Sequence, residues 1–410
     1  MVRIISSAAR RMQRLGFLKY VVASASPQRP QTGASIGRAL LNTVSRKHET
    51  IIRPEMKEYF DRVFSEQHYS DFRSRLKKAI EQQPSVQVDL ELQDIYLSQD
   101  ILPSKRGRIL SEKEKDLHVF PTLAVSLGFL SPDDSVLTSR GRLFANSVSS
   151  SENDSFSRVS DVNPLIITHE QTMILLFSFL QADSDLISLL YPIIIKKEGL
   201  FTDYEIGNHI GDLLESYLSK AEKSASSMQD KTDIAKLKKT NAKIKAWKNK
   251  EYSGVGARDE WATIRLEPYV DMGLFKKPDK FSFKYELTNG GRKFLYYFET
   301  NNNVESFLYN NYISAAAQLF GIETSAVFNS DEALDYLKQS NRLLSNNIGY
   351  SDLIDTALLS AIKLLLERKR VLEIEKAINI LREAQKNAPR DIHFNIDRWG
   401  KVKFISFRKT

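Results

Sequence analysis

The stretch Leu137-Thr138-Ser139-Arg140-Gly141-Arg142-Leu143-Phe144 returns later in the chain as Leu287-Thr288-Asn289-Gly290-Gly291-Arg292-Lys293-Phe294. Both copies fit the pattern LTxxGRxF. The match continues upstream, where a glycine, two apolar residues and a Pro-Asp pair precede each copy, in residues 128–133 and 273–279. An ordered match of this length indicates that two related structural units lie in one chain.

The shared residues predict the same local structure in both units. Gly128 and Gly273 end a helix, because glycine accepts the positive φ that a reversal of the chain needs. Thr138 and Thr288 are suited to cap the next helix through their hydroxyl groups. The strict alternation of residues 281–287 predicts the returning strand of a hairpin. All of these roles are structural, so the pattern specifies a fold and not a ligand.

The order helix, glycine, apolar pair, polar hairpin, strand, Leu-Thr and helix resembles the winged helix–turn–helix family, through residues 111–147 and again through residues 258–298. In that family the helix before the glycine is the recognition helix and the hairpin is the wing. The resemblance implies a mainly α fold with small β-hairpins, of the α+β class, containing two winged-helix units.

Composition, periodicity and the resemblance together divide the chain into four parts. They are a basic N-terminal arm at 1–48, a first winged-helix-like domain at 49–150, a second at 163–300 with a Lys-rich insertion at 220–250, and a helical C-terminal domain at 305–410. In the last part, residues 352–386 are expected to form one charged helix, followed by a terminal β-hairpin at 392–406. That hairpin interleaves aromatic and basic residues, so it either stacks on nucleic acid or pairs its edge with another sheet.

Positive charge is concentrated in two segments. The chain has a net charge of +8, while residues 1–48 alone carry +9 and residues 220–250 carry +7, so the remaining body is acidic. Basic segments attached to an acidic body indicate a polyanionic partner.

The second unit provides the predicted contacts to nucleic acid. The resemblance places a recognition helix at 261–272 in the major groove and the basic hairpin on phosphate. In the first unit the equivalent helix is apolar and the hairpin carries Asp133 and Asp134, so we expect that copy to pack or to bind protein. The alternative for the second unit is a set of solvated charges. The predicted contacts are Arg258, Thr263, Arg265 and Tyr269 from the helix, and Lys276, Lys277 and Lys280 from the hairpin.

The Lys-rich insertion and the N-terminal arm are further candidates. In the insertion, an apolar stripe through Ile234, Leu237 and Ile244 would dock the helix, while its lysines face phosphate or simply solvent. The N-terminal segment, which has no acidic residue before Glu49, fits a basic arm or a mitochondrial transit peptide, and we favour the arm. The candidate contacts are Lys236, Lys239 and Lys243 in the insertion, and Arg10, Arg11 and Arg14 in the arm.

Signals for catalysis are absent from the sequence. The chain contains no cysteine, no phosphate-binding GxxxxGK[ST] loop, no HExxH pair and no GxSxG elbow. We therefore predict no catalytic residue, no metal site and no cofactor. The remaining alternative is a metal-dependent nuclease that uses Asp89 and Glu91, although Gln93 replaces the lysine that such a site would require. The chain contains no apolar run of about 20 residues, so we predict no membrane span.

The sequence therefore predicts a non-enzymatic protein that binds double-stranded DNA through winged-helix units. We expect protein partners or a homo-oligomer, no membrane and no small-molecule substrate, as in a subunit of a larger DNA-processing, genome-maintenance or antiviral, anti-phage defence complex. The alternative is a scaffold of the chromosome-organising type, in which tandem winged helices hold partner chains. A cytoplasmic, nucleoid-associated location follows from the arm, and a mitochondrial matrix location from the transit peptide.

Overall fold

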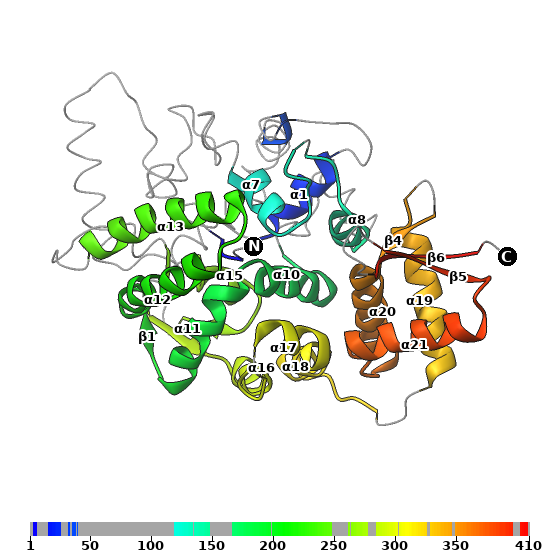
Figure 1. Cartoon of the computed structure of the whole chain (residues 1–410). Helices are drawn as coiled ribbons and strands as arrows, with labels where there is room; N and C mark the ends of the chain where they lie inside the picture. The colour runs from blue at the N-terminus through cyan, green and yellow to red at the C-terminus, as the bar shows by residue number, and fades with distance from the viewer. Residues whose placement is uncertain are drawn as a thin grey trace, which may run out of the picture.

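The computed structural model is mainly helical, with two three-stranded antiparallel sheets in the part that it describes (Figure 1). The fold class expected from the sequence, mainly α with small β-hairpins, is therefore confirmed. Asp89 and Glu91 lie outside the described residues, as does the rest of 40–118. The structure describes residues 3–5, 15–25, 32, 35–37, 39, 119–133, 135–147, 166–197, 199–247, 261–262, 264–277, 284–301, 303–325, 329–346, 349–396 and 402–408.

The N-terminal helix packs against the first copy of the repeat. Helix α1 (Phe17–Ser24) contacts both α7 (Val119–Ser126) and α8 (Ser139–Asn146). The rings of Phe17 and Phe120 lie 5.1 Å apart. Between α7 and α8, a single bridge joins Leu130 to Leu137 and forms the whole described hairpin of this unit.

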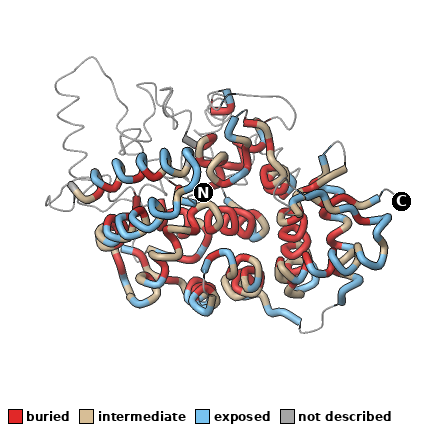
Figure 2. The backbone as a smooth tube through the Cα atoms, in the orientation of Figure 1, coloured by how far each residue is buried: buried red, intermediate tan, exposed pale blue. Residues whose placement is uncertain are grey.

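The middle of the chain surrounds α10 (His169–Ala182), which is buried along nearly its entire length (Figure 2). Its N-terminus is fixed by a capping box between Thr168 and Gln171, and the strands that follow pair in the order β1-β3-β2. The other elements of this part are α11 (Ser184–Lys196), β1 (Phe201–Thr202), α12 (Asp203–Ser224), α13 (Met228–Trp247), α15 (Glu267–Asp271), β2 (Phe275–Lys276), β3 (Lys284–Leu287) and α16 (Asn289–Glu299).

The C-terminal part follows two connecting helices and has its own sheet, in the order β4-β6-β5. Glu373 fastens it to the body, because its carboxylate accepts the backbone N–H of Ile313 at 3.0 Å and of Ser314 at 2.8 Å. The elements are α17 (Val304–Asn310) and α18 (Tyr312–Leu319), and then α19 (Ser330–Leu344), β4 (Ser351–Asp352), α20 (Leu353–Arg368), α21 (Ile374–Asn387), β5 (Ile392–Ile396) and β6 (Val402–Phe407).

The two sheets share one topology. In each, a helix leads to a two-residue strand, further helices follow, and a hairpin returns so that its last strand lies between the other two. In the C-terminal sheet, Ser351 pairs with Ile405 and Asp352 pairs with Phe404. The terminal hairpin was expected from the sequence, whereas β4 was not. A two-residue strand is too short to show an alternation of polar and apolar residues.

Two long helices that we expected are interrupted. Residues 352–386 form two helices and not one, because the chain turns at Lys369, which has φ 58°, and becomes helical again only at Ile374. The predicted recognition helix at 261–272 is also wrong in extent. Helix α15 covers only Glu267–Asp271, and residues 264–266 form a turn before it.

The two copies of the repeat have the same hydrogen-bond geometry. Gly128 and Gly273 have φ of +75° and +81°. The hydroxyl of Thr138 accepts the N–H of Gly141 at 3.0 Å, and the hydroxyl of Thr288 accepts that of Gly291 at 2.8 Å. The repeat is therefore structural, as the sequence indicated. The copies differ at the position that Arg140 occupies in the first and Gly290 in the second.

The N-terminal residues 3–5 lie against the body of the protein and Ile5 is buried in its core, which corrects the expectation of an arm for this part of the segment. The buried carboxylate of Asp183 accepts the N–H of Ile5 at 2.9 Å and a guanidinium N–H of Arg265 at 2.7 Å. Arg265 also donates to the carbonyl of Ile5 at 3.1 Å. Helix α1 is likewise buried, because most of its side chains are apolar.

Within the described residues, no single helix is long and apolar enough to cross a membrane. Helices α10 and α11 reach the necessary length and composition only together, and they are bent by 103° at the break between them.

Candidate nucleic-acid interface

Arg265 and Tyr269 do not face solvent, which corrects their assignment as contacts to nucleic acid. The two residues are each 1% exposed. Arg265 is held by Asp183 and by the carbonyl of Trp261, at 3.0 Å from Nη1. A buried guanidinium needs such partners, since an unpaired charge inside a protein costs several kcal/mol. Burial also raises the pKa of the Tyr269 phenol, whose ring packs on Tyr191 with centroids 5.9 Å apart.

The basic hairpin of the second unit is only partly available. The side chain of Lys277 is 1% exposed, and its ammonium lies 2.5 Å from Glu267 Oε1 and 4.7 Å from the centroid of the Tyr285 ring. Its assignment as a phosphate contact is therefore corrected as well. Lys276 is exposed and pairs with Glu286 at 3.3 Å. Arg258, Thr263 and Lys280 lie outside the described residues.

The helices that precede the two hairpins of the repeat are covered. In α15, Glu267, Pro268 and Tyr269 are buried. Asp271 at the end of this helix accepts the N–H of Leu15 at 3.0 Å, so the N-terminal segment lies against it. Helix α7 is covered by α1 in the same way. Neither position presents a helix face that a duplex could reach in this structure.

Helix α13 carries its lysines beside acidic residues of α12. The apolar stripe predicted from the sequence is buried, through Ile234, Leu237 and Ile244. Lys236 and Lys239 are exposed, as a phosphate contact requires. Neighbouring lysines are neutralised, because Lys238 pairs with Glu222 at 2.6 Å and Lys245 pairs with Glu215 and with Asp212. The side chain of Lys243 is outside the described part of the chain, and so are Arg10, Arg11 and Arg14.

The structure shows a basic helix face that the sequence reasoning missed. We call it the α21 face, defined by Lys376, Asn379, Arg382 and Lys386, all of which are exposed. Their spacing of three or four residues places them on one side of the helix. The opposite side of α21 is buried and packs on α17, α19 and α20.

The surroundings of the α21 face keep it positive while moderating its charge. Arg382 donates to Asn379 Oδ1 at 3.1 Å and lies 3.7 Å from Glu375. Glu383 is a second exposed acid near this side, and Arg390 is exposed just beyond the helix. The signal was present in the sequence as Lys, Asn, Arg and Lys at helical spacing before a hairpin. It was hidden because a continuous helix was expected across Lys369.

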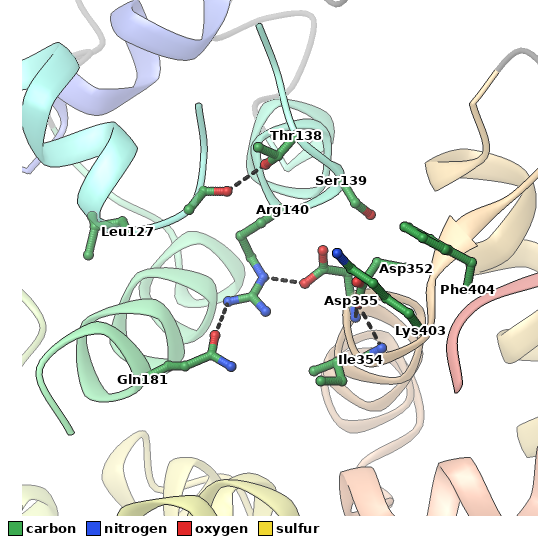
Figure 3. Close-up of a pocket in the computed structure, with 11 residues that line it drawn as sticks. Leu127, Thr138, Ser139, Arg140, Gln181, Asp352, Ile354, Asp355, Lys403 and Phe404 are labelled. Atoms are coloured by element: carbon green, nitrogen blue, oxygen red, sulfur yellow. Dashed lines mark hydrogen bonds and ion pairs between the residues drawn. The ribbon is translucent and has the colours of Figure 1, made fainter. Parts of the chain in front are cut away.

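A pocket of about 350 Å³ with both charged and apolar residues in its lining lies where the first unit meets the C-terminal part (Figure 3). Arg140 crosses this junction from α8 and forms a buried ion pair with Asp355 of α20. Its guanidinium also donates to Ser178 and to Gln181, each at 3.2 Å, and lies 4.9 Å from the centroid of the Phe177 ring. A single side chain of the repeat therefore joins α8, α10 and α20.

Asp352 is the second acid of this pocket. Its Oδ1 accepts the N–H groups of Ile354 and Asp355, at 2.9 and 3.1 Å, and caps α20. Burial, together with the charge of Asp355, raises the pKa of Asp352 from 3.8 to about 6. The carboxylate is therefore held in a place where its negative charge is not fully compensated.

Comparison with protein-family models, curated proteins and solved structures finds no match to this chain. Within the described residues, no group of three or more His, Asp or Glu side chains is placed to hold a metal ion.

Proposed function

We propose that this chain is a winged-helix protein that binds double-stranded DNA through its C-terminal part, residues 330–408. Three observations support winged-helix units. The two sheets have the same strand order, and in each the first strand lies between two helices in the chain. The third observation is that the two copies of the repeat cap their final helices in the same way. In this proposal, α21 is the recognition helix and the β5–β6 hairpin is the wing.

The α21 face is the observation that carries the proposal. It is an exposed, basic helix face beside a hairpin, in a unit whose strand order β4-β6-β5 is compatible with a winged helix. Helix α21 has 14 residues, so it is about 21 Å long, and a helix of ordinary diameter fits the major groove, which is about 12 Å wide.

The residue types of the α21 face suit the two kinds of DNA contact. Lys376 and Lys386 lie toward opposite ends of the helix, where they would neutralise phosphates on either side of the groove. Asn379 and Arg382 lie between them, and these two side chains can read adenine and guanine edges by paired hydrogen bonds. The existing bond between Arg382 and Asn379 would orient the two groups before DNA binds.

The first and second units support a second role, that of a scaffold. Their recognition positions, α7 and α15, are filled by the protein's own N-terminal segment. Such units hold chains together and do not read bases. We propose that they make the protein a non-enzymatic subunit of a larger DNA-processing, genome-maintenance or defence complex, with α13 and Lys276 as secondary phosphate contacts.

A salt titration of duplex binding tests the assignment. The wild-type protein is compared with the triple variant Lys376→Gln, Arg382→Gln, Lys386→Gln by fluorescence anisotropy of a labelled duplex. Because the phosphate contacts of Lys376 and Lys386 are lost, the slope of log K against log salt flattens by about 1.8, since each contact contributes about 0.9. The matched control is Lys236→Gln with Lys239→Gln on α13, which should flatten the slope less.

Two results would reject this assignment. If the wild-type protein shows no duplex binding at low salt, DNA binding itself is lost and the scaffold role remains. If the α13 double variant weakens binding more than the α21 triple variant does, the protein binds DNA through the insertion, and α21 is not the recognition helix.

A further inference from the structure

The pocket between the first unit and the C-terminal part, which we call the junction pocket, is lined by charged residues that do not all pair with one another. Its charged lining consists of two cations, Arg140 and Lys403, and two anions, Asp352 and Asp355. The charges come from the two sides of the junction, since Arg140 belongs to the first unit and the others belong to the C-terminal part. Arg140 and Asp355 already satisfy each other. Lys403 and Asp352 therefore remain to interact with an occupant of the pocket.

The carboxylates leave acceptor capacity in the pocket. Both N–H groups that bind Asp352 are on Oδ1, and Arg140 binds Oδ1 of Asp355. Among the described residues, no donor is recorded on Oδ2 of either aspartate. The pKa of Asp352 is raised because burial and the adjacent charge of Asp355 outweigh the effect of the groups that donate to its carboxylate. An ammonium group placed here would supply the missing positive charge.

Two groups that can donate hydrogen bonds, Lys403 and Ser139, also line the pocket. Lys403 extends from β6 toward the two aspartates (Figure 3), with its ammonium 5.2 Å from the centroid of the Phe404 ring. Ser139 begins α8, where the first backbone N–H groups of a helix have no partner within it. The hydroxyl of Ser139 is buried and has no hydrogen-bond partner among the described residues. An anionic group between Lys403 and Ser139 would find donors on both.

We propose that this pocket binds a free α-amino acid, with the ammonium group facing Asp352 and Asp355 and the carboxylate facing Lys403 and Ser139. The volume of about 350 Å³ is at the small end of ligand sites, which span about 300–1,000 Å³. Leu127, Ile354 and Phe404 form the apolar part of the lining. They favour an amino acid with an apolar or aromatic side chain.

The test uses the full-length protein and does not depend on DNA binding. Thermal unfolding is followed with each of the common amino acids at 10 mM, and the binders are then titrated by calorimetry. A dissociation constant near 1 mM would raise Tm by roughly 2 °C under these conditions. The amide of the same amino acid, which lacks the carboxylate, and its N-acetyl derivative, which lacks the ammonium, should bind at least tenfold more weakly.

Two variants locate the site. Asp352→Asn removes the charge that faces the ammonium while keeping an oxygen to cap α20, and Lys403→Gln removes the charge that faces the carboxylate. Each variant should bind the amino acid at least tenfold more weakly than the wild-type protein does. Lys386→Gln on the α21 face should leave the affinity for the amino acid unchanged. The proposal is overturned if no amino acid binds at 10 mM, if the blocked derivatives bind equally well, or if both pocket variants bind like the wild-type protein.

Discussion

Replacing Gly291 by alanine should destabilise the protein by about 2–4 kcal/mol, because no room exists for a side chain. A Cβ at this position would lie 2.1 Å from the carbonyl oxygen of Leu274. That oxygen accepts the backbone N–H of Thr288 at 3.0 Å and its hydroxyl at 3.3 Å. Moving it away disturbs the cap of α16, worth about 1 kcal/mol, and leaves a buried carbonyl unsatisfied, which costs about 1–3 kcal/mol.

Two other glycines provide a graded control for this prediction. At Gly273 a Cβ would touch nothing within 4 Å, but φ is +81°, so alanine should cost only about 1–2 kcal/mol. At Gly199 the nearest atom is 3.6 Å away, and alanine should change stability by less than about 0.5 kcal/mol. The lower chain entropy of unfolded alanine is common to all three variants and cancels in the comparison.

Urea unfolding followed by far-UV circular dichroism measures the series. The expected order of destabilisation is Gly291→Ala, then Gly273→Ala, then Gly199→Ala. Gly141→Ala should repeat the first result, since its Cβ would lie 2.0 Å from the carbonyl oxygen of Phe129. If Gly291→Ala is no more destabilising than Gly273→Ala, the close approach of the Leu274 carbonyl does not explain the glycine of the repeat.

Two further predictions concern buried charge. Asp352→Asn should stabilise the protein at pH 7 and leave it unchanged below about pH 4, as measured by urea unfolding across pH. A pKa raised from 3.8 to about 6 means that the wild type loses stability as pH rises between these values, by up to about 3 kcal/mol, and equal stability of the two proteins at pH 7 would contradict this. Arg265→Met should cost about 3–5 kcal/mol, since it leaves Asp183 buried and unpaired. Adding Asp183→Asn should recover part of that loss, and a strictly additive double variant would show that the two side chains do not interact.

The residues of the candidate interface show where sequence reasoning fails. Arg265 and Lys277 have the residue type and the position that a contact to nucleic acid needs, yet both are buried. The partner of Arg265 is 82 residues away in the chain, so no local pattern could indicate the pair. The α21 face was missed for the opposite reason. Its spacing was readable, but the helix break at Lys369 hid that α21 is a separate helix beside a sheet.

What the sequence determined by itself was the local structure. The turn at Gly128 and Gly273, the caps at Thr138 and Thr288, and the alternation of the final hairpin all depend on atoms within a few residues of each other, so they are readable in a short stretch. The tertiary structure alone decided which charges reach solvent. Arg140 shows this most clearly, because it lies inside the repeated stretch, at a position where the copies differ, and forms its ion pair with Asp355, 215 residues away. Burial depends on the summed contacts of distant segments, and a repeated pattern does not record them.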